Sequence, residues 1–456
     1  MKVVVVALGK IGLPLAAFAA LRGHEVVGCD IDAGVVDQVA AAEEPFPGET
    51  GLAEALRATV ADGRLRATTD TAQAVAEGAD LIIVVPPLVV DEQARPAWRA
   101  VDAAIAAVAE GLQRRHAAHG TTAGPDGDPP SVVVETTMPV GSTRGRISPL
   151  LATGSGLLEG VDFHSAHSPE RVFSGRIFRD LETYPKLVGG LDATGEARTA
   201  ERYRTLLGAG DDGPIEVRAL GSAEAAELTK LAETTYRDIN IGFANELARH
   251  ADRIGVDVDA VIDAANSQPF SHIHRPGVAV GGHCIPVYPR FYLAGDPEAT
   301  LPAAARAANL AMPGYAVEML GHMLARVAAE STATPLDGQR VLVLGAAYRG
   351  GVKETAFSGV FDLVRALRDA GAVPSVSDPL YDADELAAHG LPAWDGTPVD
   401  ALIVQTDHAE YRSWAPDAVP GVRAVVDGRG VLDVDAWRAA GVPVRRIGRD
   451  GIPPRS

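Results

Sequence analysis

The chain has 456 residues, of which 47% are hydrophobic and 22% are charged, and its formal net charge is -19 at pH 7. A chain of this length is expected to form two or three globular domains. A charge this negative repels nucleic acid and anionic membranes, so neither is an expected partner, and an anionic ligand requires basic side chains gathered locally.

The N-terminal residues, MKVVVVALGK, begin like a strand and not like a signal peptide. The sequence has no apolar run of about 18 residues, which is the length that a membrane span needs. The two cysteines, Cys29 and Cys284, are too few for a disulfide framework. These features predict a protein of the reducing cytoplasm.

The first half of the chain opens as a βαβ unit. The valines at 3–6 predict a strand that is buried on both faces, because no polar residue alternates with them. LPLAAFAALRG predicts a helix that ends at Gly23, and EVVGCD predicts a strand that ends at Asp30. Further strands are expected at 79–86 and 131–137, with an alanine-rich helix between them.

The segment 119–130, HGTTAGPDGDPP, is typical of a mobile surface loop. Residues 222–253 form the longest helical pattern, which only Gly242 interrupts. We expect this helix to join two domains and to contribute to a subunit interface. A second α/β unit begins near residue 339, with QRVLVLGAAYRGG as a strand and glycine turn and a helix that ends at Gly371. VPSVSDPLY, ALIVQT and RAVVDGRG predict its remaining strands.

The turn ALGKIG is the dinucleotide-binding fingerprint of a Rossmann fold with its first glycine replaced by Ala7. Gly9 allows a pyrophosphate to approach, and Gly12 allows the helix to pack on the strand. Alanine fits the first position only if its φ is negative. Asp30 is placed to accept hydrogen bonds from ribose hydroxyls, which favours NAD over NADP. A glycine turn in an unrelated α/β protein is the alternative. The predicted cofactor-binding residues are Ala7, Leu8, Gly9, Lys10, Ile11, Gly12, Asp30, Pro86, Thr136 and Thr137.

The stretch VGGHCIPVYPRFY surrounds Cys284 with residues of special backbone geometry. Gly281 and Gly282 are expected to leave space for a ligand, and two prolines stiffen the other side. This context favours a catalytic thiol, although a free cysteine is more often a small buried hydrophobe. Cys29 lies in an apolar strand and is expected to be buried. His283 adjoins Cys284, but neighbours in an extended segment point apart, so no Cys–His dyad is assumed.

The long helix carries Lys230, Thr234 and Arg237 on one face. Lys230 lies among apolar residues, so it is either a functional lysine or one whose stem is buried while its charge reaches water. ETTMPVGST ends a strand in hydroxyl groups, which is a common place for a site in α/β proteins. HSPERVFSGR brings Glu170 next to Arg171, where a surface ion pair is the alternative to a functional role.

Together these segments resemble the nucleotide-sugar 6-dehydrogenases, the family of UDP-glucose and UDP-N-acetylmannosamine dehydrogenases. The resemblance rests on ALGKIGLPLA, ETTMPVGST, SPERV, KLAETTYRDINIGFANE, PGVAVGGHCIP, SDP and VVDGRG, which occur in the family's order over nearly the whole chain. SPERV and GGHCIP are closer to the enzymes for 2-acetamido sugars than to those for UDP-glucose. The substrate implied is therefore UDP-N-acetylmannosamine or UDP-N-acetylglucosamine, with UDP-glucose as a further candidate.

The resemblance implies that the C6 alcohol of a UDP-sugar is oxidised twice with two NAD. Cys284 would attack the aldehyde, a second hydride transfer would leave a thioester, and water would release the uronate. Lys230 would stabilise charge on the C6 oxygen, while Thr137 and Glu170 would place the water. Residues 275–281 would surround the sugar, and Arg349 would serve the nucleotide. The substrate-binding residues so implied are Glu170, Arg171, Lys230, Asn240, Arg275, Gly277, Gly281 and Arg349.

The sequence departs from the family at three positions. Tyr288 stands where the family has an aspartate, Thr234 where it has an asparagine, and Ala356 where it has an arginine that contacts NAD. Loss of an anion beside Cys284 should favour the thiolate. We expect Tyr288 and Thr234 to act together as a neutral replacement in the catalytic site, and Lys353 to compensate for the arginine.

The predicted fold class is α/β, with two Rossmann-like parallel-sheet domains joined by a long central helix and a helical linker region. The expected domains are an NAD-binding domain at 1–215, a helical and dimerisation region at 216–330 that carries the catalytic lysine and cysteine, and a UDP-sugar-binding domain at 331–456. A homodimer without a metal is expected. Two alternatives remain: a two-electron hydroxy-acid dehydrogenase, and a sugar-nucleotide-binding protein without activity.

Overall fold

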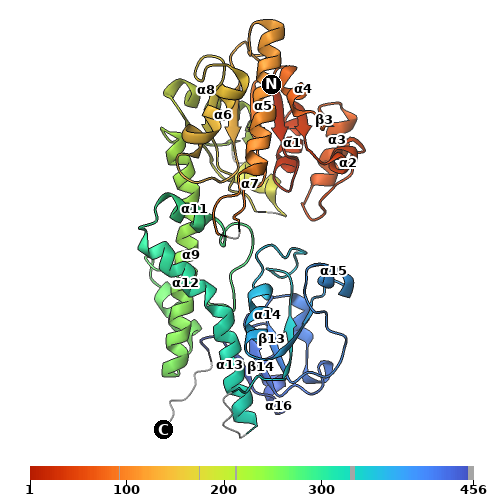
Figure 1. The fold of residues 1–456 in the computed structure, drawn as a ribbon, viewed down its shortest axis with the longest axis vertical. Coiled ribbons are helices and arrows are strands. Elements are labelled where there is room, and N and C mark those ends of the chain that lie inside the picture. The colour runs from red at the N-terminus through yellow and green to blue at the C-terminus, as the bar shows by residue number, and fades with distance from the viewer. Residues whose placement is uncertain (92, 174, 211–212, 329–333, 450–456) are drawn as a thin grey trace. The chain divides into compact units, whose positions relative to one another are not determined.

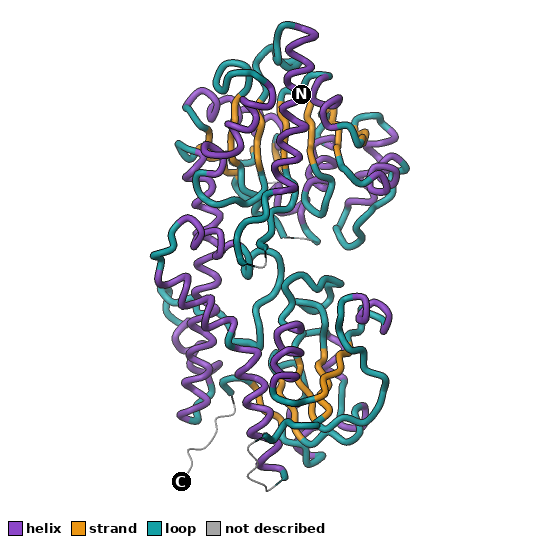
Figure 2. Tube along the Cα trace, in the orientation of Figure 1, coloured by secondary structure: helices purple, strands orange, loops and turns teal. Residues whose placement is uncertain are grey.

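The computed structural model describes residues 1–449 except 92, 174, 211–212 and 329–333. The chain divides into two compact units, of which unit 1 comprises Met1–Glu233 and Arg290–Gly295, and unit 2 comprises Thr234–Pro289 and Asp296–Ser456. Each unit contains its own sheet with flanking helices (Figures 1 and 2). The sheet of unit 2 is wholly parallel, and that of unit 1 is parallel except where β7 pairs with β6. The predicted α/β fold class is therefore confirmed. The predicted boundary at 330/331 lies outside the described residues.

Unit 1 is built on an eight-stranded sheet in the order β10-β7-β6-β5-β4-β1-β2-β3. Strands β1 to β6 are parallel, and their order in the sheet, β3-β2-β1-β4-β5-β6, is that of a dinucleotide-binding Rossmann fold. β7 is antiparallel to β6. The strands are β1 (Lys2–Val6), β2 (Glu25–Cys29), β3 (Leu65–Thr68), β4 (Leu81–Val84), β5 (Ser131–Val134), β6 (His164–His167), β7 (Lys186–Gly190), β10 (Val217–Ala219) and the short pair β8 (Ala209–Gly210) and β9 (Gly213–Pro214).

The first helix, α1 (Gly12–Leu21), is apolar on all sides and almost wholly buried. A helix of this composition is stable only when other elements cover every face, and α1 packs against α3, α7 and the sheet. The other helices of unit 1 are α2 (Ala33–Ala40), α3 (Leu52–Ala61), α4 (Thr71–Ala76), α5 (Arg99–His119), the π-helix η1 (Thr143–Ile147), α6 (Ser148–Ser155), α7 (Ile177–Thr183) and α8 (Ala193–Leu207).

The loop predicted to be mobile at 119–130 is held to unit 1 by several contacts. The backbone N–H of Asp126 donates to Asp80 at 2.9 Å, and the Asp126 carboxylate pairs with Arg202 at 2.8 Å. The hydroxyl of Thr122 is bonded to the carbonyl of Asp162, and Thr122 is buried. The expectation of a mobile loop was wrong, because its aspartate and threonine side chains anchor it.

Unit 2 contains a five-stranded, wholly parallel sheet in the order β12-β11-β13-β14-β15. Its strands are β11 (Arg340–Leu344), β12 (Val373–Ser377), β13 (Ala401–Val404), β14 (Ala424–Asp427) and β15 (Val444–Arg446). Its helices are α10 (Val258–Asn266), α12 (Thr300–Leu310), α13 (Met312–Val327), α14 (Val360–Asp369), α15 (Ala383–Ala388), α16 (Val434–Ala439) and the 3-10 helices η2 (Ala409–Ser413) and η3 (Pro416–Ala418).

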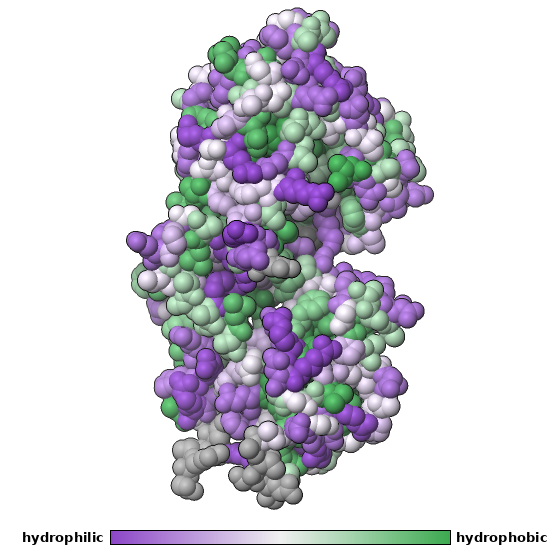
Figure 3. All heavy atoms as spheres, viewed as in Figure 1, coloured by the Kyte–Doolittle hydropathy of each residue, from purple (hydrophilic) through white to green (hydrophobic). Residues whose placement is uncertain are grey.

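Two helices belong to both units: α9 (Ala223–Ile254) and α11 (Tyr288–Gly295). The long helix predicted at 222–253 is α9. On the face shown in Figure 3, polar and apolar residues are interspersed over the surface. No helix in the described part of the chain is long and apolar enough to cross a membrane.

A buried ion pair connects α9 and α12 within unit 2. The guanidinium of Arg306 donates through Nε to Asp238 at 2.5 Å, and Asn309 donates to the same carboxylate at 2.7 Å. Asp238 is fully buried and Arg306 is 6% exposed. Because both charges have left water, each depends on the other for compensation.

We expect Arg306→Met to lower the free energy of unfolding by about 3–5 kcal/mol, because it leaves the Asp238 carboxylate buried without its cation. The measurement is chemical denaturation. The double variant Asp238→Leu/Arg306→Met removes both charges and should recover most of the loss. An Arg306→Met protein as stable as the parent would contradict this account.

Candidate active site

The glycine turn follows β1 at the carboxyl edge of the unit 1 sheet. A Cβ on Gly12 would lie 1.9 Å from the carbonyl oxygen of Ala7, so only glycine lets the helix start so close to the strand. A Cβ on Gly9 would meet nothing within 4 Å, which leaves open space beside the start of α1. The N-terminus of α1 thus offers backbone N–H groups and room for a pyrophosphate. The residues present therefore fit a dinucleotide.

Ala7 has a φ of +78°, in the left-handed region. The expectation of a negative φ at this position was wrong. Its backbone N–H donates to the carbonyl of Cys29 at 2.8 Å, so strand pairing with β2 holds the turn in the geometry that a glycine would adopt freely.

Asp30 follows β2 and binds the same turn. Its carboxylate accepts the backbone N–H of Leu8 at 2.7 Å and that of Asp32 at 3.0 Å. Each carboxylate oxygen has further lone pairs, so these bonds leave capacity for ribose hydroxyls. The role of Asp30 in NAD binding stays a prediction.

Strands β4 and β5 bring three more of the predicted cofactor residues to this edge. The hydroxyl of Thr136 donates to the carbonyl of Pro86 at 2.5 Å, which links the ends of the two strands. Thr137 follows and is buried. The chain reverses its strand order between β1 and β4, and ligands of open α/β sheets bind at such a point.

Glu170 lies just beyond β6. Its carboxylate accepts the backbone N–H groups of Arg171 and Val172, the latter at 2.6 Å. The guanidinium of Arg171 donates to Glu233 at 2.8 Å, so an ion pair engages this predicted substrate residue. Sequence reasoning missed a buried lysine nearby: Lys186 Nζ lies 3.8 Å from Glu170 Oε2 and 2.7 Å from Glu135 Oε1.

Lys230 lies on α9 and is 9% exposed, whereas Leu228 on the same helix is 44% exposed. The ammonium is therefore largely withdrawn from bulk water. His167 at the end of β6 is fully buried, and burial lowers its pKa to about 3, with a smaller contribution from Lys186 and Lys230. His167 is thus neutral, and it adds no charge next to the lysines.

The two cysteines differ as predicted. Cys29 is buried in β2, and burial raises the pKa of its thiol to about 12. Cys284 is exposed in the turn that leads into α11. Its carbonyl accepts the backbone N–H of Tyr288 at 2.9 Å, so Tyr288 begins the helix one turn after the thiol.

Gly281 and Gly282 are packed against the rest of unit 2. A Cβ on Gly281 would lie 2.7 Å from Cβ of Tyr348, and one on Gly282 would lie 3.1 Å from the Tyr348 ring. Gly282 also has a φ of +93° and donates its N–H to the carbonyl of Ala356 at 3.1 Å. The expectation that these glycines leave room for a ligand was wrong: the room is taken by Tyr348.

His283 turns toward Glu354. The two side chains approach to 3.5 Å, which forms an ion pair when the imidazole is protonated. Together with the contacts of the glycines, this places the thiol turn against the segment 348–358. Lys353 pairs with Glu385, so its charge is already compensated where it was expected to replace the family arginine.

The loop 275–281 is fixed by side chains from two helices, α9 and α10. Asn240 binds the backbone of its start, with its Oδ1 accepting the N–H of His274 at 2.8 Å. Asn245 accepts the N–H of Gly277 at 3.0 Å. Arg275 pairs with Asp259 at 3.2 Å and with Asp263. Asn240 and Arg275, both predicted to bind substrate, therefore also hold the loop.

Arg429, in the VVDGRG segment after β14, was missed as a candidate. Its guanidinium donates to the carbonyl of Gln405 at 2.6 Å and to that of Ala279 at 3.2 Å. It therefore joins the end of β13 to the loop 275–281. The sequence predicted a strand at RAVVDGRG, and only the fold shows what the arginine after it reaches.

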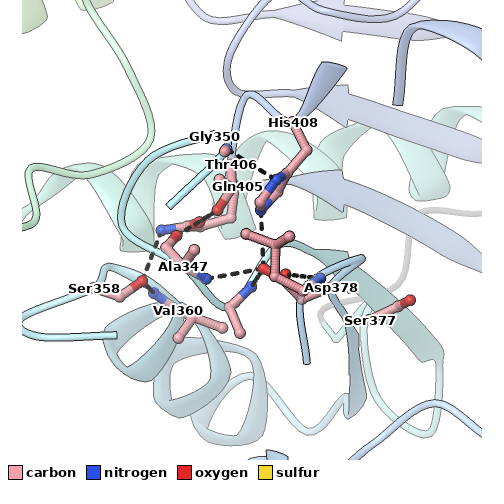
Figure 4. A network of polar contacts seen from close by, with 12 residues as sticks. Ala347, Gly350, Ser358, Val360, Ser377, Asp378, Gln405, Thr406 and His408 are labelled. Atoms are coloured by element: carbon pink, nitrogen blue, oxygen red, sulfur yellow. Dashed lines mark hydrogen bonds and ion pairs between the residues drawn. The ribbon is translucent and has the colours of Figure 1, made fainter. Parts of the chain in front are cut away.

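Arg349 follows β11 and is exposed beside the ring of Tyr348. A network of polar contacts holds the turn that follows β11 (Figure 4). Asp378 accepts the backbone N–H of Ala346 at 2.7 Å and the ring N–H of His408 at 3.1 Å. Asp378 occupies the place of the ribose-binding acid of a dinucleotide fold, but it is committed to its own turn.

Comparisons with known proteins show to which family the chain belongs. Three models of the UDP-glucose/GDP-mannose dehydrogenase family match it in order: the NAD binding domain at residues 1–207, the central domain at 224–311 and the UDP binding domain at 342–434. The chain belongs to this family. It is an NAD-dependent nucleotide-sugar dehydrogenase, as the resemblance in the sequence predicted.

Several relatives are similar over their full length. A UDP-N-acetyl-D-mannosamine dehydrogenase of Pyrococcus horikoshii is 32% identical over 99% of this chain and 100% of its own. An NDP-N-acetyl-D-galactosaminuronic acid dehydrogenase of Ralstonia solanacearum is 32% identical over 94% of this chain and 95% of its own. The solved structure of the Pyrococcus horikoshii enzyme matches with a TM-score of 0.82 at 30% identity, covering 99% of this chain and 100% of that one. A UDP-glucose dehydrogenase structure from Pyrobaculum islandicum matches with a TM-score of 0.80 at 27% identity, covering 96% and 98%.

We expect Ala7→Gly to stabilise the protein by about 1 kcal/mol, because it removes the cost of a left-handed alanine. Thermal unfolding of parent and variant measures the difference. Gly12→Ala is the matched control in the same turn: its methyl group would collide with the Ala7 carbonyl, so it should destabilise the fold and weaken NAD binding. An Ala7→Gly variant less stable than the parent would show that the turn does not strain Ala7.

Proposed function

We propose that this dehydrogenase oxidises the C6 alcohol of a UDP-2-acetamido sugar, such as UDP-N-acetylmannosamine or UDP-N-acetylglucosamine, to the uronate in two steps. The observation that carries the proposal is the exposed thiol of Cys284, held in a defined turn of a chain that matches the family over all three domains. The names of the relatives support an acetamido sugar, although UDP-glucose dehydrogenases also share the fold.

Unit 1 supplies the groups for cofactor and water. The turn Ala7–Gly12, Asp30, Pro86 and Thr136 would hold NAD, which accepts a hydride when bound. Lys230 would stabilise negative charge on the C6 oxygen, since an ammonium withdrawn from water interacts strongly with a developing oxyanion. Thr137 and Glu170 would orient the hydrolytic water.

Cys284 acts between the two oxidations. Its thiolate attacks the aldehyde carbon and forms a C–S bond, which keeps the aldehyde from escaping. Loss of a second hydride from that carbon, together with the proton of its hydroxyl group, would leave a thioester; a second NAD, when bound, would supply the hydride acceptor. Water then forms a C–O bond, the C–S bond breaks, and the electron pair returns to sulfur as thiolate.

The nucleotide end of the substrate would be bound by unit 2. Arg349 is exposed and cationic, so it can pair with a diphosphate in a protein whose net charge is -19. Arg171, Lys230 and Asn240 would contact the sugar, together with Arg275 and Gly277 of the loop. The three predicted domains, with ends near 215 and 330, would separate cofactor binding, catalysis with dimerisation, and nucleotide binding.

A homodimer is proposed from the surface of α9 in unit 2. A groove of about 440 Å³ is lined by Phe243, Glu246, Leu247, Arg249, His250 and Arg253, and Phe243 is 49% exposed. Large exposed apolar groups on a helix are typical of a subunit interface. We also place the enzyme in the cytoplasm, because its exposed thiol must remain reduced.

The stoichiometry of NADH tests the proposed function. Incubation of a limiting amount of UDP-sugar with excess NAD should release two NADH and one uronate, because the thiol retains the aldehyde for the second oxidation. NADH absorbance and product mass are the measurements, over a panel of UDP-sugars. One NADH per sugar would support the two-electron alternative, and none with any sugar would support an inactive binding protein.

Tyr288 and Thr234 are proposed to replace the family's aspartate and asparagine as a neutral pair. Tyr288→Phe removes one hydroxyl with little change of shape. We expect it to slow at least one of the two oxidation steps by about tenfold, the effect of losing one hydrogen bond of about 1.4 kcal/mol in the transition state. Single-turnover kinetics resolves the steps. Tyr292→Phe, a tyrosine of the same helix, is the control; unchanged rates in Tyr288→Phe would refute the pairing.

A further inference from the structure

A cluster of buried charges lies in unit 1 beside Glu170. Lys186, at the start of β7, is 7% exposed, and Glu135, at the end of β5, is fully buried. Lys186 Nζ lies 2.7 Å from Glu135 Oε1 and 3.8 Å from Glu170 Oε2, so one cation faces two carboxylates. Tyr203 on α8 completes the cluster: its hydroxyl donates to Glu135, and its ring lies 5.0 Å from the ammonium.

The fold alone does not require these charges. Buried ion pairs cost desolvation energy, and apolar residues of similar volume often stabilise a protein as well or better. The arrangement is also asymmetric: Glu135 Oε1 accepts the Tyr203 hydroxyl and forms an ion pair with Lys186 Nζ at 2.7 Å. Glu135 Oε2 and Lys186 Nζ are both buried without a hydrogen-bond partner in the described part of the chain. An unsatisfied carboxylate oxygen is a site at which a proton is readily bound.

A small cavity adjoins the cluster. It has a volume of about 20 Å³, and Glu170, Arg171, Tyr184 and Lys186 are among its lining residues. A volume of about 10–15 Å³ suffices for one water molecule where polar groups line the space. The separation of 3.8 Å between Lys186 and Glu170 is too long for a direct hydrogen bond, and one water can bridge it.

We propose that Lys186 is a positioning residue for Glu170, and that the charge of Glu135 sets how firmly this shared lysine holds Glu170. The inference rests on the proposed function, in which Glu170 orients the hydrolytic water. In that step a proton leaves the attacking water for the Glu170 carboxylate. The water oxygen bonds to the thioester carbon, and the C–S electron pair returns to Cys284. The ammonium of Lys186 attracts the Glu170 carboxylate and holds it in place. An ionised Glu135 attracts the same ammonium, so it weakens the hold of Lys186 on Glu170.

The groups that face Glu135 make its charge sensitive to pH near neutrality. Burial raises its pKa to about 7, Lys186 opposes the shift, and Glu170 adds to it. Tyr203 keeps its proton, since burial holds its pKa well above 10. His167 on β6 is neutral, because burial lowers its pKa to about 3. Lys230 of α9 is the remaining charged group near His167.

The direction of the effect follows from these charges. Below pH 7 Glu135 is protonated and Lys186 acts on the Glu170 carboxylate alone, which holds that carboxylate in place. As the pH rises through about 7, Glu135 becomes ionised, competes for Lys186 and repels the Glu170 carboxylate. Lys186 then holds the Glu170 carboxylate less firmly. The rate of thioester hydrolysis should therefore fall through an inflection near pH 7, in the same direction as the loss expected for Lys186→Gln.

The test uses the full-length enzyme with UDP-sugar and NAD in single turnover, quenched at intervals between pH 6 and 9. Intact-protein mass follows the adduct on Cys284, and NADH absorbance follows the two oxidations. The variants are Glu135→Gln, Lys186→Gln, the double variant Glu135→Gln/Lys186→Gln and Tyr203→Phe. Glu159→Gln is the matched control, because Glu159 is a carboxylate in the same unit whose pKa burial also raises, but its bonds go to Ser165.

We expect Glu135→Gln to lose the inflection near pH 7 while both oxidations keep their rates. Lys186→Gln should slow hydrolysis by about 10–100-fold and accumulate the adduct, since it misplaces the group that takes the proton. If the buried Glu135 prevents Lys186→Gln from folding, the double variant carries the test, because it buries no unpaired charge. It should fold, hydrolyse the thioester slowly and show no inflection.

A double variant with the hydrolysis rate and pH profile of the wild type would overturn the inference and leave the cluster a structural one. So would a Glu159→Gln control that loses the inflection, because the effect would then not be specific to the cluster. Failure of the proposed function has a different signature: the wild type itself would form neither a Cys284 adduct nor a uronate at any pH.

Discussion

The parallel order of the strands is the constraint on which the proposed chemistry depends. Parallel strands of one sheet end at the same edge, so residues far apart in the sequence are brought together there. The glycine turn after β1, Asp30 after β2, Thr136 after β5 and Glu170 after β6 all lie at the ends of such strands. The same rule places Arg349 after β11 and Arg429 after β14 in unit 2. Short parallel strands are therefore the frame of both groups of residues.

Close packing sets the second constraint. Gly12 lets α1 approach the carbonyl of Ala7, and Gly281 and Gly282 let the thiol turn lie on Tyr348. Both sets of glycines are therefore needed for close packing within the protein. The turn that carries Cys284 packs against Tyr348, and Tyr348 directly precedes Arg349, the residue proposed to bind the nucleotide. The proposed recognition of the nucleotide by Arg349 and the placement of Cys284 would therefore depend on one short segment of unit 2.

Much of the fold was predictable because local patterns decide it. The valine runs of β1 and β5, the glycine after α14 and the long periodicity of α9 each have a local physical cause, and the structure has elements at these places. The candidate residues could be named from motifs, but not their partners. Lys186 lies in an ordinary-looking segment, YPKLVGG, and acquires meaning only when β7 brings it to Glu135. The left-handed φ of Ala7 likewise depends on pairing with Cys29. The anchoring of the loop 119–130 depends on its contacts with Asp80 and Arg202.

The central claim is that Cys284 carries the sugar covalently between two oxidations. The most direct measurement is the mass of the peptide that contains residue 284, after acid quench of the wild-type enzyme and of Cys284→Ser during turnover. The account predicts a uronyl adduct on the wild-type peptide, and in Cys284→Ser an ester that hydrolyses far more slowly or no second oxidation. Full uronate formation by Cys284→Ser at the wild-type rate would contradict covalent catalysis by this thiol.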